Sequence, residues 1–199
     1  MTHPDRQEEK KALRRQARAA RAALDPGWRA EASRRMHEHL LRIDPVREAE
    51  TISLFVSVGA EVDTHPLIHA FLAAHKRVAV PCVLHAQRRL ELRVIESFPD
   101  GFQARDFGIL EPEPLHHPEV VGIADVDVIL VPGLLFNPGN GIRLGYGGGY
   151  YDRLLAEEHQ ALAIALGFST QLVAELPVEP WDRPVDAICT DAGWHPIRI

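Results

Sequence analysis

Residues 126–152 read VDVILVPGLLFNPGNGIRLGYGGGYYD, and this stretch decides the fold. Its first six residues form a nearly all-apolar run, which is typical of a central parallel strand buried on both faces of a sheet. A glycine-rich loop follows, and we expect a helix from about residue 149 to residue 158. In open α/β sheets, ligands bind beyond the carboxyl ends of the strands. The sequence therefore predicts a binding site at residues 143–151.

Apolar strands alternate with helices along the rest of the chain. Strands are expected at residues 51–58, 77–84, 90–95, 161–167 and 184–189, and helices at 8–24, 26–41 and 66–75. This alternation predicts an α/β protein, a three-layer α/β/α sandwich around a mostly parallel sheet with the N-terminal helices packed on it. Residues 97–125 are rich in proline and are expected to be surface loops. We expect a single domain over residues 1–199, with residues 1–7 a flexible tail.

Composition narrows the class of protein. The chain has 199 residues, of which 46% are hydrophobic and 25% charged, as in an ordinary globular domain. The net charge of -6 argues against a nucleic-acid partner, which usually demands a basic surface. The two cysteines, Cys82 and Cys189, lack metal-site spacing and favour a reducing, cytoplasmic location. No apolar run is long enough for a membrane span, and none of the eleven histidines has convincing ligand spacing.

The glycine-rich segment has two open interpretations. Glycines after a buried strand let backbone N–H groups close on a phosphate, and a helix N-terminus adds partial positive charge. Arg143 adds a forked guanidinium that could grip two phosphate oxygens. The segment is neither a P-loop nor a dinucleotide fingerprint, because both motifs require residues that are missing here. A plain flexible turn is an equally good interpretation of the residues alone.

The first predicted helix carries a basic stripe beside its apolar one. At 100° per residue, Leu13, Ala17, Ala20 and Leu24 share one face. A neighbouring stripe consists of Lys10, Arg14, Arg18 and Arg21, while Lys11 and Arg15 point further outward. Charge runs on helices are usually solvated surfaces, but charges that border a buried face can also reach into a cleft.

Several motifs together resemble one known family. RLGYGGGYYD at residues 143–152, preceded by VPGLLF at 131–136, closely resembles the signature of the 5-formyltetrahydrofolate cyclo-ligase family. KKALR at 10–14 looks like the basic N-terminal helix of that family, and SVGAEVDT at 57–64 looks like its first-strand turn. Glu111-Pro112 and the acidic segment 176–186 are further similarities, so the resemblance covers nearly the whole chain.

The resemblance implies an ATP-dependent ring closure. In this reaction the formyl oxygen of 5-formyltetrahydrofolate attacks the γ-phosphate of ATP, and N10 then displaces phosphate from the imino-phosphate intermediate to give 5,10-methenyltetrahydrofolate. It also implies Mg²⁺ and two small-molecule substrates. We expect a monomer, and the net charge and the short apolar runs predict no nucleic-acid or membrane partner. Two alternatives stay open from the sequence, namely a phosphosugar isomerase of similar fold and a folate- or nucleotide-binding module without turnover.

Matching positions assign the site residues that the resemblance implies. The ATP-binding residues would be Lys10, Arg14, Arg143, Leu144, Gly145, Tyr146, Gly147, Gly148, Gly149, Tyr150 and Tyr151. Arg143 and Tyr151 would be catalytic, and Asp152 and Asp182 would bind the magnesium ion. Folate would contact Val58, Glu61, Phe136, Tyr146 and Tyr150.

Simpler interpretations of these residues remain open without the resemblance. Asp152 would then be a favourable charge in the first helical turn, Asp182 an exposed loop acid, and Glu61 a solvated turn residue. The aromatic side chains could serve core packing only.

Two positions depart from the pattern of the family. Gly148 stands where many members carry Lys or Arg, and Asn137 stands where Asp is common. The first change removes a loop charge, which would leave more of the phosphate charge to Arg143, Lys10 and Arg14. The second would remove a minor contact to metal or solvent.

Overall fold

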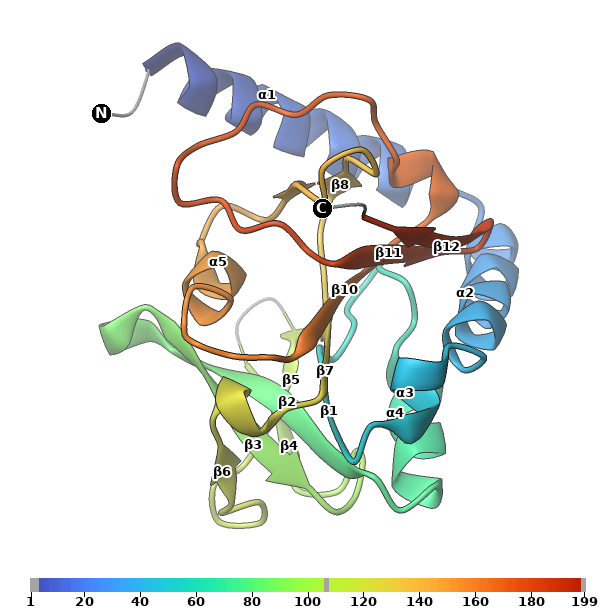
Figure 1. Ribbon diagram of the computed structural model, residues 1–199, viewed down its shortest axis with the longest axis vertical. Coiled ribbons are helices and arrows are strands. Elements are labelled where there is room, and N and C mark those ends of the chain that lie inside the picture. Colours follow the sequence, from blue (N-terminus) through green and yellow to red (C-terminus); the bar gives the residue numbers. More distant parts are fainter. Residues whose placement is uncertain (1–3, 106–107, 198–199) are drawn as a thin grey trace.

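The computed structural model describes residues 4–105 and 108–197, and its centre is an eight-stranded sheet in the order β12-β11-β10-β7-β1-β2-β3-β6 (Figure 1). Five central strands run parallel: β11 (Ala187–Thr190), β10 (Leu162–Leu166), β7 (Val128–Val131), β1 (Thr51–Leu54) and β2 (Arg77–Leu84). The remaining strands each pair antiparallel with a neighbour: β12 (Gly193–Pro196), β3 (Arg89–Ile95) and β6 (Val120–Val121). The predicted mostly parallel sheet is therefore confirmed.

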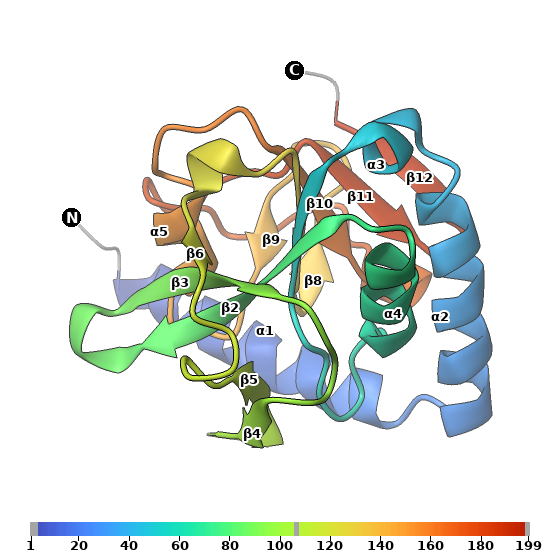
Figure 2. The ribbon, with the colours of Figure 1, turned by 90° about the horizontal axis from the view of Figure 1, so that it is seen from below.

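Helices cover both faces of this sheet, as the α/β/α prediction requires (Figures 1 and 2). One face packs against α2 (Pro26–Leu40), α3 (Asp44–Glu48) and α4 (His65–Ala73). The other face packs against α5 (Tyr150–Leu154) and the loops around it. The long α1 (Pro4–Ala22) crosses the end of the sheet where β7 leads into the glycine-rich segment (Figure 1).

Strand β7 has the double burial that its apolar run predicts. Val128 and Leu130 pack in the core on the α2 side, and Ile129 and Val131 pack in the core on the α5 side. All four side chains are essentially inaccessible to solvent. Burying a side chain of this size contributes about 1.5–3 kcal/mol, so this strand anchors both layers to each other.

Several elements differ from the sequence prediction. Helix α1 begins at Pro4, so residues 4–7 are helical rather than part of a tail, and residues 1–3 lie outside the described residues. Strand β1 ends at Leu54 rather than at residue 58, and α5 ends at Leu154 rather than near 158. The supposed loop at 97–125 contains β4 (Phe102–Ala104), β5 (Leu110–Pro112) and β6. Helix α3 and the small hairpin of β8 (Leu135–Phe136) and β9 (Arg143–Leu144) were not predicted.

The order of the strands fixes where a ligand can enter. From β1 the chain proceeds to β2 on one side, while β7 and β10 lie on the other side. The connections therefore diverge between β1 and β7, which leaves a crevice at the carboxyl ends of these two strands. Residues 55–61 follow β1, and the glycine-rich segment follows β7. The fold thus brings the two most distinctive motifs of the sequence to the same crevice.

Phe136 lies in the core rather than at the crevice, which corrects its expected role as a wall for the pterin. Its ring is fully buried between Gly133 and Gly167. A Cβ atom at either glycine would lie 2.5 Å or less from the ring, so both positions exclude larger residues. Phe136 therefore holds the β8–β9 hairpin against the sheet.

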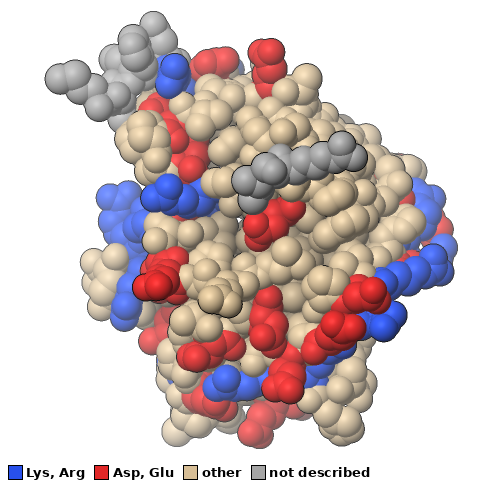
Figure 3. Space-filling view, in the orientation of Figure 1, with Lys and Arg blue, Asp and Glu red and all other residues tan. Residues whose placement is uncertain are grey.

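The surface view shows how charge is distributed on one face. On the face seen in Figure 3, acidic side chains are spread widely and many of the basic ones lie toward the margins. Among the described residues, no helix has the length and apolar character needed to cross a membrane.

Candidate active site

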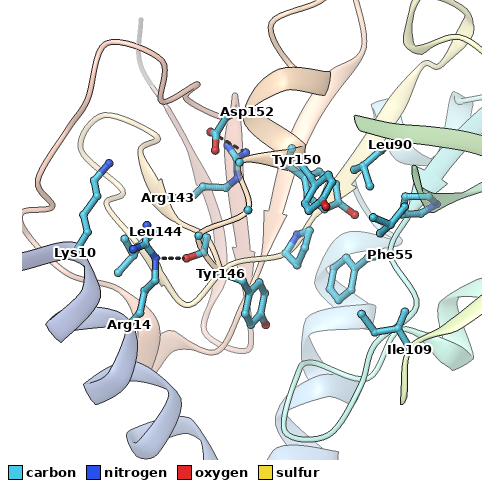
Figure 4. Close-up of a pocket in the computed structure, with 18 of the residues that line it drawn as sticks. Lys10, Arg14, Phe55, Leu90, Ile109, Arg143, Leu144, Tyr146, Tyr150 and Asp152 are labelled. Atoms are coloured by element: carbon cyan, nitrogen blue, oxygen red, sulfur yellow. Dashed lines mark hydrogen bonds and ion pairs between the residues drawn. The ribbon is translucent and has the colours of Figure 1, made fainter. Parts of the chain in front are cut away.

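A cavity of about 1030 Å³ opens at the crevice between β1 and β7 (Figure 4). Its walls come from α1, the segment after β1, the β2–β3 hairpin, residues 109–111, the glycine-rich segment, and residues 179–182. All sequence-predicted site residues except Phe136 line it: Lys10, Arg14, Val58, Glu61, Arg143, Leu144, Gly145, Tyr146, Gly147, Gly148, Gly149, Tyr150, Tyr151, Asp152 and Asp182. The structure therefore brings together residues from distant parts of the chain.

The cavity has two chemically different ends. Lys10 and Arg14 project from α1 toward one end, and Phe55, Leu90 and Ile109 lie at the other (Figure 4). The apolar end is completed by Val56, Pro81, Val83 and Leu110. A cation-rich end beside an apolar chamber suits a phosphorylated ligand next to a flat, mostly apolar one.

The basic stripe of α1 faces the glycine-rich segment. Arg14 Nε donates to the carbonyl of Gly145 at 3.0 Å, and Arg18 Nη2 donates to that of Tyr146 at 3.3 Å. Arg21 Nη1 donates to the carbonyl of Gly133 at 3.3 Å. These bonds attach α1 to the glycine-rich segment and to Gly133. The interpretation of this stripe as a solvated surface is therefore wrong.

The apolar stripe of α1 is less buried than its pattern suggests. Ala17 is buried but Ala20 is exposed, and the buried Lys10 lies on the basic side. Lys11 and Arg15 are both exposed, as the helical wheel predicts, and Lys11 pairs with Glu8 on the surface at 3.6 Å. The helix thus docks through its charges as well as its alanines.

Lys10 forms an ion pair with Asp182 at the cationic end of the cavity. The two side chains are only 8% and 11% exposed, so Asp182 is not an exposed loop acid. The same oxygen, Asp182 Oδ2, also accepts the backbone N–H of Glu179 at 2.8 Å. This pair joins the N-terminal helix to the C-terminal segment across the cavity.

Arg143 is already engaged within the protein. Its side chain is 2% exposed; Nη1 donates to the carbonyl of Arg183 at 2.7 Å, and Nη2 donates to Asp152 Oδ1 at 3.0 Å. Asp152 Oδ1 also accepts the backbone N–H of Arg183 at 3.2 Å. Burial lowers the pKa of Arg143, and the charge of Asp152 opposes this shift. The guanidinium thus orients Asp152 and fixes the backbone at residue 183. The sequence predicted instead that both Nη atoms of Arg143 would bind phosphate oxygens.

Glu61 is held at the apolar side of the glycine-rich segment. Its Oε2 accepts the backbone N–H of Val58 at 2.9 Å, and its Oε1 accepts a hydrogen bond from the hydroxyl of Tyr146. Arg21 Nη2 lies 3.9 Å from the same Oε1. Burial and the charge of Glu61 raise the pKa of Tyr146, so this phenol stays protonated and acts as a donor. Glu61 is therefore a fixed acceptor rather than a solvated turn residue.

Tyr151 also keeps its proton. Burial raises its pKa far above neutrality, and the charge of Glu61 adds to the shift. The ring packs against both cores while also lining the cavity. Its hydroxyl can therefore donate a hydrogen bond but cannot act as a base near neutral pH.

The ring of Tyr150 leaves no room for a side chain at position 148, which explains the glycine there. A Cβ atom there would lie 2.7 Å from the ring of Tyr150. The guanidinium of Arg153 lies 5.2 Å from the centroid of that ring, and its Nη2 donates to the carbonyl of Gly148 at 2.7 Å. Arg153 thus places a positive charge beside the uncharged loop position 148.

Asn137 lies outside the cavity. Its Nδ2 donates to the carbonyl of Ala174 at 2.9 Å, and its Oδ1 accepts the backbone N–H of Gly139 at 2.8 Å. The side chain is nearly buried and shapes the turn before β9. Asn137 therefore does not line the cavity, and the expected loss of a minor metal or solvent contact does not concern this site.

Some cavity residues were not predicted from the sequence. Arg18 was seen only as part of the stripe, although its spacing from Arg14 places it on the same helical face. Glu179 and Trp181 lie beside Asp182 and could have been found by extending that motif. Ile109 and Leu110 come from a stretch without any periodic signal.

Comparisons with known proteins agree with this arrangement. Residues 6–191 match the model of the 5-formyltetrahydrofolate cyclo-ligase family. The chain is 33% identical to the 5-formyltetrahydrofolate cyclo-ligase of Escherichia coli over 87% of its own length and 95% of the relative. It is 32% identical to that of Haemophilus influenzae, covering 87% and 92% of the two chains.

A solved structure extends the similarity to the fold. The 5,10-methenyltetrahydrofolate synthetase of Aquifex aeolicus superposes with a TM-score of 0.82 at 31% identity, covering 96% of this chain and 93% of that one. The family match spans nearly every element that builds the cavity. From its sequence, its fold and the residues of its cavity, this chain belongs to the 5-formyltetrahydrofolate cyclo-ligase family.

Proposed function

We propose that this protein catalyses the ATP-dependent cyclisation of 5-formyltetrahydrofolate to 5,10-methenyltetrahydrofolate, with release of ADP and phosphate. The observation that carries the proposal is the two-ended cavity. At one end of the cavity, Arg14 donates a hydrogen bond to the glycine-rich segment. The adjoining end is an apolar chamber that also contains the carboxylate of Glu61.

The chemistry proceeds in two balanced steps. The formyl oxygen attacks the γ-phosphorus, a P–O bond to ADP breaks, and an imino-phosphate forms on N5. N10 then attacks the formyl carbon, the C–O bond breaks, and phosphate leaves with the former formyl oxygen as N10 loses its proton. Phosphoryl transfer needs alignment and charge neutralisation more than covalent help. A cavity built from arginines, glycines and carboxylates suits this requirement.

The nucleotide would lie along α1 and the glycine-rich segment. Lys10 and Arg14 supply cations, and the backbone N–H groups of residues 145–149 supply neutral donors. Hydrogen bonds to charged groups contribute about 1.5–3 kcal/mol each. Arg143 acts by holding Asp152 in place, and Tyr151 donates a hydrogen bond at the reacting end of the cavity.

The acidic residues at this end fit a magnesium ion. The described residues contain no group of three or more His, Cys, Asp or Glu side chains able to hold a metal. Mg²⁺ is typically bound by one or two carboxylates together with substrate phosphates, and Asp152 and Asp182 are the two carboxylates proposed for it. The buried Glu179 Oε1 nearby has no hydrogen-bond partner, which also favours a cation in this region. When bound, the ion would neutralise charge on the phosphates.

The folate would occupy the apolar chamber. The pterin ring presents adjacent N–H donors, and a fixed carboxylate such as Glu61 can accept two of them. Val58 and the rings of Tyr146 and Tyr150 line the adjacent walls. The formyl group would then face the glycine-rich segment.

We further propose that the protein is a monomer of a reducing compartment. Cys82 and Cys189 are both buried and free, and burial raises their pKa values to about 11 and about 12. Both thiols stay protonated and unreactive, in keeping with a cytoplasmic protein.

Lys10→Ala is expected to weaken ATP binding at least tenfold, whereas Arg15→Ala should leave it within twofold of the wild type. Lys10 is buried at the cavity, but Arg15 is exposed on α1 and does not line the cavity. Calorimetric titration with Mg-ATP measures both constants. Equal small effects for the two variants would show that the stripe does not contact the phosphates.

Tyr146→Phe is expected to tighten folate binding severalfold. The hydroxyl of Tyr146 occupies Glu61 Oε1, which the pterin would need, and phenylalanine removes this competitor while keeping the ring. Titration with 5-formyltetrahydrofolate provides the measurement, with Tyr150→Phe as the matched control. Weaker folate binding in Tyr146→Phe would show that the hydroxyl helps to hold the substrate.

An omission assay tests the proposed function as a whole. Purified protein is mixed with Mg-ATP and 5-formyltetrahydrofolate, and the absorbance of the methenyl product is followed. We expect product only when the folate, ATP and magnesium are all present. Product without ATP would exclude this mechanism, and binding of both ligands without product would support the non-catalytic alternative.

A further inference from the structure

Trp181 is exposed beside the cationic end of the cavity. It is 47% exposed and lines the cavity, whereas Trp28 and Trp194 pack against the core. A large aromatic side chain that is left open at the rim of a cavity commonly serves to bind a ligand. The cavity is also lined by Gln7, Glu8 and Lys11 of α1.

The segment that carries Trp181 is held rigidly by the proposed phosphate site. Lys10 pairs with Asp182, the next residue along the chain, and Arg143 donates to the carbonyl of Arg183. On the other side, Arg6 Nη1 donates to the carbonyl of Val178 at 3.0 Å. A hydrogen bond from the backbone N–H of Asp182 to the carbonyl of Glu179, at 3.0 Å, closes the turn that contains Trp181. Trp181 thus immediately precedes Asp182, the residue that pairs with Lys10.

The direction of the nucleotide follows from the chemistry. For phosphoryl transfer, the γ-phosphate must face the apolar chamber that would hold the folate. The nucleoside must then extend in the opposite direction, past Lys10 toward the end lined by Trp181. An aromatic face can stack on a nucleobase, and such a contact contributes about 1–3 kcal/mol.

We propose that Trp181 is the platform on which the adenine base of ATP stacks. This inference rests on the proposed function, because it takes ATP as the ligand. It assigns a binding role to a residue outside the glycine-rich segment and the basic stripe. Stacking recognises the flat base and not the phosphates. Loss of the indole should therefore weaken binding of ATP but not of a ligand that has only the phosphates.

The test compares two ligands that share their phosphates. Calorimetric titrations with Mg-ATP and with Mg-tripolyphosphate are made on the wild type, Trp181→Ala and Trp181→Phe. Trp181→Ala is expected to weaken ATP binding about 5- to 150-fold while tripolyphosphate binding changes less than twofold. Trp181→Phe should retain most of the affinity for ATP, since it keeps an aromatic face.

Two results would overturn the proposal. Unchanged ATP affinity in Trp181→Ala would show that the indole does not contact the base, and equal loss of both ligands would assign Trp181 to the shape of the phosphate site. A thermal melt of each variant identifies any that fail to fold, in which case Trp181→Phe and quenching of the indole fluorescence in the wild type by ATP decide. Failure of the wild type to bind ATP would instead contradict the proposed function itself.

Discussion

Arg143→Ala is expected to lose both activity and stability. Its guanidinium holds Asp152 and the carbonyl of Arg183, so the variant leaves a partly buried carboxylate without its counter-charge. We expect kcat/KM to fall about 100- to 1000-fold, as when a preorganised electrostatic group is removed. The free energy of unfolding should fall by about 2–4 kcal/mol, which lowers the melting temperature by on the order of 10 °C for a chain of this size.

Arg143→Lys and Arg15→Ala complete this experiment. Lysine keeps the charge beside Asp152 but cannot bond both partners in the same geometry, so we expect an intermediate loss of rate and a raised magnesium requirement. Arg15 is exposed on α1, and its removal should change neither the rate nor the melting temperature. Normal turnover in Arg143→Ala would contradict the role given to this residue.

Glu61→Gln is expected to weaken folate binding about 10- to 100-fold and to leave ATP binding within twofold. Glutamine can still accept the N–H of Val58 through its remaining oxygen, but it loses the charge and the second acceptor that the pterin requires. Calorimetric titrations with 5-formyltetrahydrofolate and with Mg-ATP provide the two constants.

Asp63→Asn is the matched control in the same turn. Asp63 Oδ1 accepts the backbone N–H of His65 at 3.0 Å at the start of α4, and Asp63 does not line the cavity. Its substitution should lower stability without altering the affinity for folate. Equal loss of folate and ATP binding in Glu61→Gln would show that Glu61 maintains the structure of the site instead of contacting the pterin.

The parts of the site that follow from local spacing were predictable from the sequence. The burial of β7 follows from its apolar run, and the glycine-rich segment after it lies at the carboxyl end of that strand as expected. The inward face of α1 follows from residues spaced three to four apart, which share one side of a helix. The spacing alone could not distinguish a cleft from solvent, because that depends on the carbonyls of Gly145 and Tyr146.

The parts that depend on distant residues were not predictable. Phe136 enters the core because Gly167, which is far along the chain, leaves room for its ring. Arg143 is occupied because the chain returns forty residues later and presents the carbonyl of Arg183. Neither partner can be recognised from the residues around Phe136 or Arg143. The chamber wall at Ile109 likewise depends on the fold of a segment without periodicity.

The fate of the formyl oxygen tests the central claim most directly. The substrate 5-formyltetrahydrofolate is labelled with ¹⁸O in its formyl group, converted in ordinary water with Mg-ATP, and the released phosphate is analysed by mass spectrometry. Because the formyl oxygen becomes bonded to the γ-phosphorus before N10 displaces it, we expect one ¹⁸O atom in each phosphate released during ring closure. Unlabelled phosphate accompanying full formation of the methenyl product would contradict phosphorylation of the formyl group.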